Sequence, residues 1–277
     1  MLLATLPGTV QAQVVAERGY SPGRFWAGTG VIVGTNAAVM IGLNQLWYAD
    51  YERGAFRWHN DWPNWRQQDK LGHLAASWHI ARGVGAYGRW SGLSPAQAGL
   101  YGAAVSVVFQ SQIEVLDGFS EAWGASAGDV LFNTIGAVAG GLQVAYPEAN
   151  AVTLKYSYHR SPNADPSESY AGNMLKDYDG ASFWLVARPH ELGVAGWPEW
   201  LGISIGHSAD GLANALPTPE SPHRRVWLIG PDFDFFRTIN WPAPWLQRTA
   251  DVLSFIRIPA PALKISSDGV VGYVLYW

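Results

Sequence analysis

Long apolar stretches separated by short charged ones make up the first half of the chain. Three stretches contain no Lys, Arg, Asp or Glu, and they cover residues 25–49, 90–113 and 130–147. Each approaches or exceeds the roughly 20 residues that cross the apolar layer of a bilayer as a helix. A further helix is predicted over 68–87, because Gly88 and a Ser-Gly-Leu-Ser-Pro loop follow it. The pattern predicts a bundle of about four apolar helices.

After residue 147 the pattern changes from helical to alternating. Strands are predicted over 153–158, 183–187, 201–205, 226–229, 232–235 and 272–277. One amphipathic helix over 244–255 interrupts them. The number of strands falls below the eight of the smallest bacterial spanning barrels, which favours an antiparallel sheet packed on the helices.

The predicted fold class is α+β and membrane-associated, with a helical bundle over residues 23–150 and a small antiparallel β region over 151–277. Residues 1–22 form an N-terminal segment. Its first dozen residues resemble the end of a secretory signal with a cleavage site after Ala12, although the usual basic region is missing. A soluble helical bundle is the alternative, because the buried helices of soluble proteins have the same apolar pattern.

Composition narrows the classes of function. Only 14% of the residues are charged, against about 25% in an average soluble domain. The net charge of -4 offers no basic surface, so nucleic acid is not an expected partner. Because the sequence contains no Cys, a disulfide framework, a thiolate metal site and a Cys nucleophile are excluded.

Three of the predicted helices carry a pair of polar residues about one turn apart, near one end. The pairs are Asp69 with His73, Glu114 with Asp117, and Asp129 with Asn133. The first and third pairs begin their helices and the second ends its helix. In an antiparallel bundle with short loops the three pairs meet at one level, so we expect them to line one cavity mouth, with Lys70 and Glu121 nearby.

Two kinds of chemistry suit such a cluster. Oxygen ligands with an imidazole suit a divalent cation, and the candidate ligands are Asp69, His73, Glu114, Asp117 and Asp129. Crowded carboxylates also raise one another's pKa, which favours acid–base catalysis by His73, Glu114 and Asp117, with Asn133 orienting one of them. The structural alternative is that the pairs tie helices together and that Asp69 and Asp129 are helix caps.

Resemblance to known families lies in four segments, D-K-L-G-H at 69–73, I-E-V-L-D-G-F-S at 113–120, W-G-A-S at 123–126 and D-V-L-F-N-T-I-G at 129–136. They are similar to the YfiM-type family of envelope lipoproteins, a domain of unknown function. The order D-K-x-x-H, then E, then D-x-x-x-N-x-x-G also resembles the core of VanZ-like membrane proteins. The resemblance extends from about residue 40 to the end of the chain.

What the resemblance implies is a protein of the bacterial cell envelope. The absence of Cys leads us to expect no lipid anchor, so that the helices or the C-terminal strands hold the protein in place. The aromatic ending at 273–277 is similar to the assembly signal of outer-membrane barrels, whereas helical spans are unusual in an outer membrane. The expected location is therefore the outer membrane or a periplasm-facing position, with the choice of membrane left open.

Two functions are therefore expected. In the first, the polar cluster binds or acts on an envelope lipid or glycan-lipid, with membrane lipid as the partner. In the second, the protein is a non-catalytic structural or accessory subunit that docks other envelope proteins through its aromatic surface and sheet edge.

Overall fold

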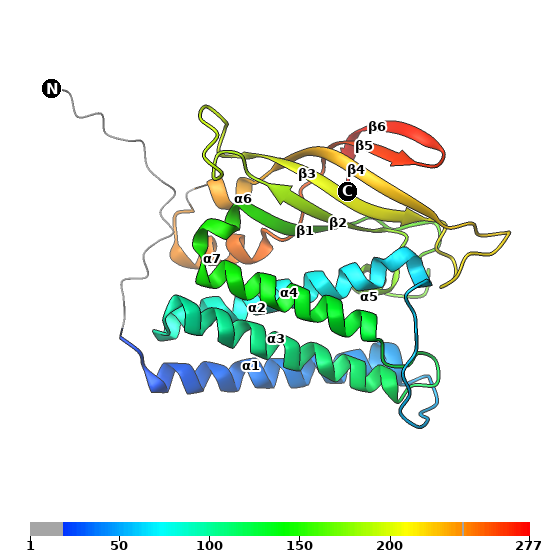
Figure 1. Cartoon of the computed structure of the whole chain (residues 1–277), viewed down its shortest axis with the longest axis horizontal. Coiled ribbons are helices and arrows are strands. Elements are labelled where there is room, and N and C mark those ends of the chain that lie inside the picture. Colours follow the sequence, from blue (N-terminus) through cyan, green and yellow to red (C-terminus); the bar gives the residue numbers. More distant parts are fainter. Residues whose placement is uncertain (1–18, 240) are drawn as a thin grey trace.

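The computed structural model describes residues 19–239 and 241–277, and these residues form two layers (Figure 1). Long helices form one layer, and a curled antiparallel sheet covers its upper side in the view of Figure 1. The α+β class predicted from the pattern is confirmed. The predicted signal remnant within residues 1–22 lies mostly outside the described residues.

The helical layer consists of α1 (Pro22–Leu43), α2 (Gln68–Ser91), α3 (Pro95–Gly118) and α4 (Ala127–Ala145). A π-helical turn, η1 (Asn44–Tyr48), extends α1, and a 3₁₀ turn, η2 (Asn64–Gln67), precedes α2. Side-chain oxygens of Ser21, Ser94 and Ser126 accept backbone N–H groups and so cap the starts of α1, α3 and α4. Gly92, with φ at 97°, ends α2 in the left-handed conformation that glycine adopts easily.

Glycines let α2, α3 and α4 pack with their backbones nearly in contact. A Cβ added at Gly102 of α3 would lie 2.2 Å from the carbonyl oxygen of Ala81 in α2. A Cβ at Gly136 of α4 would lie 2.2 Å from the carbonyl oxygen of Leu74, also in α2. This close approach explains why the apolar stretches are rich in small residues, and it brings the polar ends of the helices together.

Helix α1 lies at the outside of the bundle, and none of its residues is buried. Two polar contacts join it to α3, where Asn36 Nδ2 donates to Gln112 Oε1 at 3.0 Å and the hydroxyls of Thr29 and Tyr101 lie 2.9 Å apart. Among the described residues, Pro22–Tyr48 is the one helical segment long and apolar enough to cross a membrane, with 27 residues and a mean hydropathy of 1.4. The charge-free stretches in α3 and α4 do not meet this criterion.

The sheet has six strands in chain order, each antiparallel to the next. They are β1 (Val152–Tyr158), β2 (Ala181–Ala187), β3 (Leu201–Asp210), β4 (Arg224–Phe233), β5 (Ala260–Ser266) and β6 (Gly269–Tyr276). The sheet curls on itself, because Tyr156 of β1 also pairs with Ile256, just before β5.

Two apolar cores hold the sheet in place. The inner side chains form one core, which contains Trp184, Val186, Val226, Leu228, Ala262 and Tyr276. The outer side chains of β1 and β2 form the second core against α2, which contains Ala75, Leu154, Ala181 and Phe183. Burial of this apolar surface attaches the sheet to the bundle.

Several predicted elements need correction. Besides the four long helices, the described residues include α5 (Tyr170–Lys176), α6 (Phe235–Thr238), α7 (Pro244–Leu253) and the 3₁₀ turn η3 (Pro147–Ala151). Helix α7 lies inside the amphipathic segment predicted over 244–255. The strands predicted over 226–229 and 232–235 are parts of one strand, β4, and the chain then turns into α6. Strand β5 was not predicted, because Pro261 interrupts its alternation.

Candidate functional site

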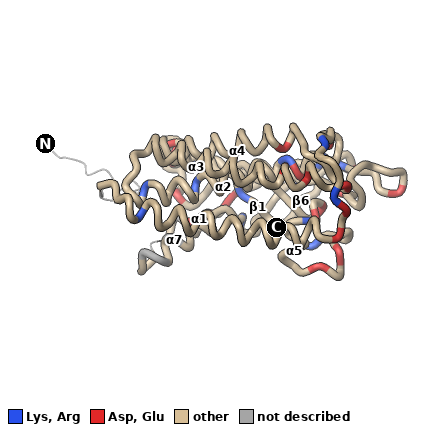
Figure 2. The backbone as a smooth tube through the Cα atoms, turned by 90° about the horizontal axis from the view of Figure 1, so that it is seen from below, with Lys and Arg blue, Asp and Glu red and all other residues tan. Residues whose placement is uncertain are grey.

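The polar ends of α2, α3 and α4 meet at one end of the bundle, on the right in Figures 1 and 2. Figure 2 shows Lys, Arg, Asp and Glu gathered at this end, while the middle of the helices is largely uncharged. The structure brings together all six residues predicted to converge and adds two neighbours. We call these eight residues the polar cluster: Asp61, Asp69, Lys70, His73, Glu114, Asp117, Asp129 and Asn133.

Lys70 is fully buried and three carboxylates surround its ammonium group. Its Nζ lies 2.6 Å from Asp61 Oδ2, 3.0 Å from Asp69 Oδ2 and 2.9 Å from Asp129 Oδ1. The same nitrogen donates to the hydroxyl of Ser126 at 3.3 Å. Burial lowers the pKa of Lys70, but the surrounding carboxylates outweigh that effect and raise the pKa, so the lysine stays charged.

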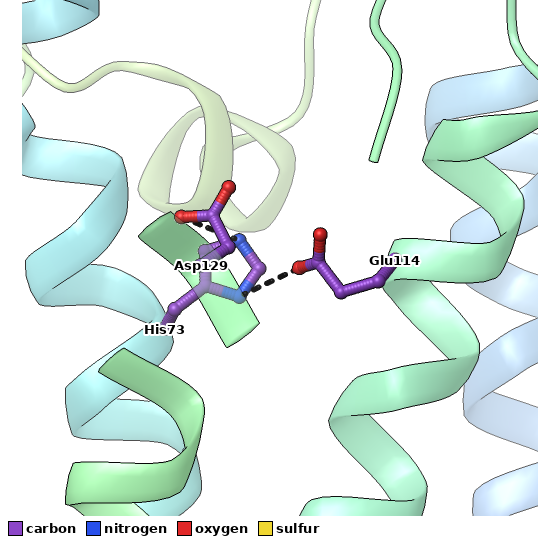
Figure 3. Close-up of side chains that lie close together, drawn as sticks. All are labelled: His73, Glu114 and Asp129. Carbon is purple, nitrogen blue, oxygen red and sulfur yellow. Dashed lines mark ion pairs between the residues drawn. The ribbon is translucent and has the colours of Figure 1, made fainter. Parts of the chain in front are cut away.

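His73 lies between two carboxylates that come from two other elements (Figure 3). Its Nδ1 is 3.8 Å from Glu114 Oε1, and its Nε2 is 3.8 Å from Asp129 Oδ1. The side chain of His73 is 18% exposed, whereas those of Glu114 and Asp129 are each 6% exposed. Asp129 therefore contacts both the lysine and the histidine and joins the two halves of the cluster.

Asn133, one turn after Asp129 in α4, lies within hydrogen-bond distance of the imidazole. Its Oδ1 lies 3.1 Å from His73 Nδ1 and also accepts hydrogen bonds from Ser77 Oγ and Gln110 Nε2 at 3.1 and 3.0 Å. Because an amide oxygen can only accept, this contact places a proton on Nδ1. In the neutral ring the lone pair is then on Nε2, facing Asp129, where it can take a proton or bind a cation.

Asp117 lies at the edge of the polar cluster, next to the end of α1. The hydroxyl of Tyr48 in η1 donates to Asp117 Oδ1 at 2.8 Å. Asp117 is not in either group of carboxylate and imidazole atoms that come within 4.8 Å of one another. Its position therefore suits a link between α1 and the cluster better than direct ligation of a cation.

Burial raises the pKa of most carboxyl groups in the cluster. It raises the pKa of Glu114 to about 7 and those of Asp69 and Asp117 each to about 6, and it also raises the pKa of Asp129. Burial acts in the same direction on Asp61, but hydrogen bonds from Lys70 and Ser126 overcome it and lower the pKa. Near neutral pH the cluster therefore contains groups that can both release and accept protons.

A left-handed turn precedes the cluster. Trp65, Arg66 and Gln67 have φ values of 50°, 49° and 64°, which residues with a Cβ adopt only at a cost in energy. Contacts from the sheet side hold this turn. Arg225 of β4 donates to the carbonyl of Arg66 at 3.2 Å and to the side chain of Gln67, and the N–H of Trp65 donates to the carbonyl of Ala215 at 2.8 Å.

A pocket of about 390 Å³ opens beside the cluster. It is lined by Trp58, His59, Asn60, Ser126, Ala127 and Gly128. Ser126 connects the pocket to the cluster, because its hydroxyl donates to Asp61 Oδ1 at 2.5 Å and accepts from Lys70. Gly128 leaves room for the methylenes of Lys70, since an added Cβ would lie 2.8 Å from Lys70 Cε.

Two groups of ligand atoms in the described residues are close enough to hold a cation. In the group Asp61, Asp69 and Asp129, the ammonium of Lys70 already lies among the carboxylates. The group His73, Glu114 and Asp129 offers two carboxylates and one imidazole, a donor set that suits a divalent cation. Its Asp129 Oδ1 also pairs with Lys70 Nζ at 2.9 Å, so a cation there would lie beside the ammonium. Asp69 Oδ1 and the side-chain amide of Gln68 are buried without a hydrogen-bond partner in the described residues.

Sequence reasoning missed the parts of the site that come from loops. Asp61 lies before η2, and Tyr178 lies between α5 and β2. Burial and the nearby charges of Asp69, Asp129, Asp117 and Asp61 raise the pKa of Tyr178. No periodicity marks either residue. Gln110 and Ser77 could have been found, because each lies one helical turn from a predicted site residue on the same helix face.

Fold and site together define an α+β protein with a buried acidic cluster at one end of a glycine-packed helical bundle. Residues 57–145, about a third of the chain, match a family described as Predicted periplasmic lipoprotein (DUF2279). These residues include α2, α3, α4 and all eight residues of the polar cluster, whereas the neighbouring Tyr48 and Tyr178 lie outside the match. No curated protein and no solved structure matches the chain. The similarity supports a periplasm-facing protein of the bacterial envelope with unknown activity.

Proposed function

We propose that the protein is an envelope membrane protein whose polar cluster binds a divalent cation and, through it, the polar headgroup of an envelope lipid or glycan-lipid. The observation that carries this proposal is the excess of acid in the cluster, of which Asp69, Glu114 and Asp129 are buried. Five carboxyl groups surround one lysine and one histidine, and His73, Glu114 and Asp129 present their ligand atoms within 4.8 Å of one another. A bound cation offsets the cost of burying so many carboxylates.

The position of the cluster supports a lipid headgroup as the ligand. Tyr48 ends the candidate membrane-crossing segment and donates to Asp117, so the cluster lies just beyond that segment. Exposed aromatic residues surround this level, including Tyr51, Phe56, Trp58 and Trp62. Aromatic side chains favour the interface between lipid and water, where headgroups lie. The resemblance of the order D-K-x-x-H, E, D-x-x-x-N-x-x-G to the core of VanZ-like membrane proteins agrees with this setting.

In this function each residue has a distinct role. His73, Glu114 and Asp129 bind the cation, and Asn133 holds the imidazole with Nε2 directed to Asp129. Lys70 neutralises Asp61 and Asp69 and fixes their positions. Burial raises the pKa of Glu114 to about 7 in the metal-free protein, and binding of the cation lowers it again, so cation binding releases a proton at neutral pH.

The test is the lipid that remains bound after purification in mild detergent without chelator. Extraction and mass spectrometry should find one lipid class enriched over the bulk membrane in the wild type and lost in His73→Ala and Glu114→Gln. The matched control is Asp179→Asn, which alters a buried carboxylate outside the cluster. The same lipid profile in all four proteins would contradict the proposal.

The second candidate is the structural or accessory subunit. It is favoured by the many exposed apolar side chains, such as Trp26, Leu100 and Val138, which offer surface to another envelope protein. Co-purification of a single protein at equal stoichiometry, unaffected by His73→Ala, would support this candidate over lipid binding.

A further inference from the structure

The curled sheet has an unusual distribution of polar and apolar side chains. Charged side chains lie inside it, where Lys155 pairs with Asp232 at 2.7 Å and Arg257 stacks over Trp184 at 3.8 Å. These four residues are at most 1% exposed. The apolar inner core, which includes Val186, Val226 and Leu228, lies beside them. The unusual side is therefore the outer one, because a sheet that faces water there normally presents polar side chains.

The outer surface of the sheet is apolar where α2 does not cover it. Its exposed residues on β2, β3, β4 and β5 are Leu185, Ile203, Ile205, Trp227, Ile229 and Leu263, with exposed fractions between 42% and 53%. We call these six residues the outer sheet face. On β3 and β4 they alternate with buried residues, so they project from one side of the strands.

An apolar surface also lies on the opposite side of the molecule. In Figure 1, α1 and the sheet lie on opposite sides of the layer formed by α2 and α4. Helix α1 has no buried residue, and Val31 and Ile41 are 68% and 62% exposed. A single protein partner covers one side of a molecule, whereas lipid surrounds a membrane protein on all sides. Because α1 and the outer sheet face are opposed apolar surfaces, they favour lipid as the ligand of both.

The lengths and directions of α1, β3 and β4 agree with lipid contact on both apolar surfaces. The loop after β3 reaches the polar end, because Ala215 accepts a hydrogen bond from Trp65. Helix α1 ends at the same level, because Tyr48 contacts Asp117. Strands β3 and β4 have 10 residues each, which matches the 9–11 residues of a strand that crosses the apolar layer. At the other end of these strands lie Trp200 and Phe233, whose rings are 6.0 Å apart.

We propose that the outer sheet face contacts lipid acyl chains, at the same depth in the membrane as α1. This inference rests on the proposed membrane function and extends it, because it makes the sheet a membrane-contacting layer. The polar cluster and its loops then remain at the membrane boundary, beside the aromatic residues around Trp58 and Trp62.

The absence of Cys makes a direct test possible, because each introduced cysteine is a single labelling site. Three variants are labelled with a nitroxide and placed in bilayers of phosphatidylethanolamine and phosphatidylglycerol. They are Ile205→Cys on the outer sheet face, Ile41→Cys on α1, and Asp268→Cys in the exposed turn between β5 and β6. Accessibility to oxygen and to a water-soluble nickel complex is measured by electron paramagnetic resonance.

The proposal predicts that positions 205 and 41 have an oxygen-to-nickel accessibility ratio several-fold above that of position 268. A low ratio at 205 with a high ratio at 41 overturns this inference and leaves the proposed function standing. Low ratios at both positions overturn both proposals. Protection of 205 from both reagents shows that a protein covers the face and also overturns the inference. If Ile205→Cys lacks wild-type circular dichroism, Ile203→Cys replaces it.

Discussion

At the scale of single residues, the site depends on how charge is balanced away from water. Lys70 contacts three carboxylates, and Asp129 is shared between Lys70 and His73. Removing one member of such a group leaves the charges of the others buried without a partner. The loss in the free energy of unfolding is then much larger than for a surface ion pair. Two predictions follow from this balance.

Replacing Lys70 by Met should lower the free energy of unfolding by about 3–5 kcal/mol, because Asp61, Asp69 and Asp129 then repel one another in a buried space. Chemical denaturation in detergent measures the change. The matched control is Lys176→Met, which removes a partly exposed pair with Glu168 and should cost less than about 1 kcal/mol. Equal losses in the two variants would show that Lys70 has no special electrostatic role.

The raised pKa of Glu114 predicts how stability depends on pH in metal-free protein. The folded state holds this proton up to a pKa of about 7, whereas the unfolded state releases it near 4.5. The folded state therefore binds more protons between these values, and the free energy of unfolding falls as pH rises through them, by on the order of 3 kcal/mol.

Denaturation curves in the presence of chelator between pH 4.5 and 7 test this dependence. Glu114→Gln should flatten it, and the control Glu121→Gln, at an exposed position, should leave it unchanged. If wild type and Glu114→Gln share one pH profile, Glu114 does not titrate as the structure predicts.

How much of the site the sequence predicts depends on where each residue lies. The six residues on helices could be chosen because helical spacing places them one turn apart and antiparallel packing places them at one level. Asp61 and Tyr178 could not, since they come from loops whose positions depend on contacts across the whole fold. Arg225 was missed for the same reason, because it reaches the turn at 65–67 from a strand distant in sequence.

At the scale of elements, the bundle depends on glycines that allow helices to approach closely. Gly102→Ala should destabilise the protein by about 1–3 kcal/mol, because the new methyl group would lie 2.2 Å from the carbonyl oxygen of Ala81. Gly83→Ala on the open face of α2 should instead stabilise it by about 0.5–1 kcal/mol through helix propensity. Thermal unfolding of both variants measures the contrast, and a shift of the same sign in both would contradict the packing argument.

The left-handed turn links the sheet to the polar cluster. Arg225→Ala should increase hydrogen exchange of the backbone amides at 65–70 and cost about 1–3 kcal/mol, because it removes charged hydrogen bonds that hold the turn. Its neighbour Arg224, paired with Asp268 at the surface, provides the control. Unchanged exchange at 65–70 in Arg225→Ala would mean that the turn holds its shape without the sheet.

The elements themselves were predictable to different degrees. The long helices follow from apolar stretches bounded by Ser caps and Gly92, which are local signals. Strand β5 and the curl of the sheet depend on pairing between distant segments, such as Tyr156 with Ile256, and no local pattern encodes that pairing. The short helices α5 and α6 lie in turns whose sequences favour no regular element strongly.

At the scale of the whole molecule, polar and apolar groups are separated along its length as well as between inside and outside. Charged residues gather at the end where α2 begins (Figure 2). Apolar side chains are exposed on both α1 and the outer sheet face. In the proposed function, a site at the boundary between these zones reaches a headgroup while α1 and the outer sheet face contact the apolar layer. This arrangement links the fold to the proposed function.

The measurement that tests the central claim most directly is the metal content of protein purified without chelator, determined by elemental mass spectrometry. The wild type and Asp179→Asn should each contain one divalent cation per chain, and Asp129→Asn and His73→Ala should contain much less while keeping wild-type circular dichroism. Absence of metal from the wild type, or equal metal in all four proteins, would contradict a cation site at His73, Glu114 and Asp129.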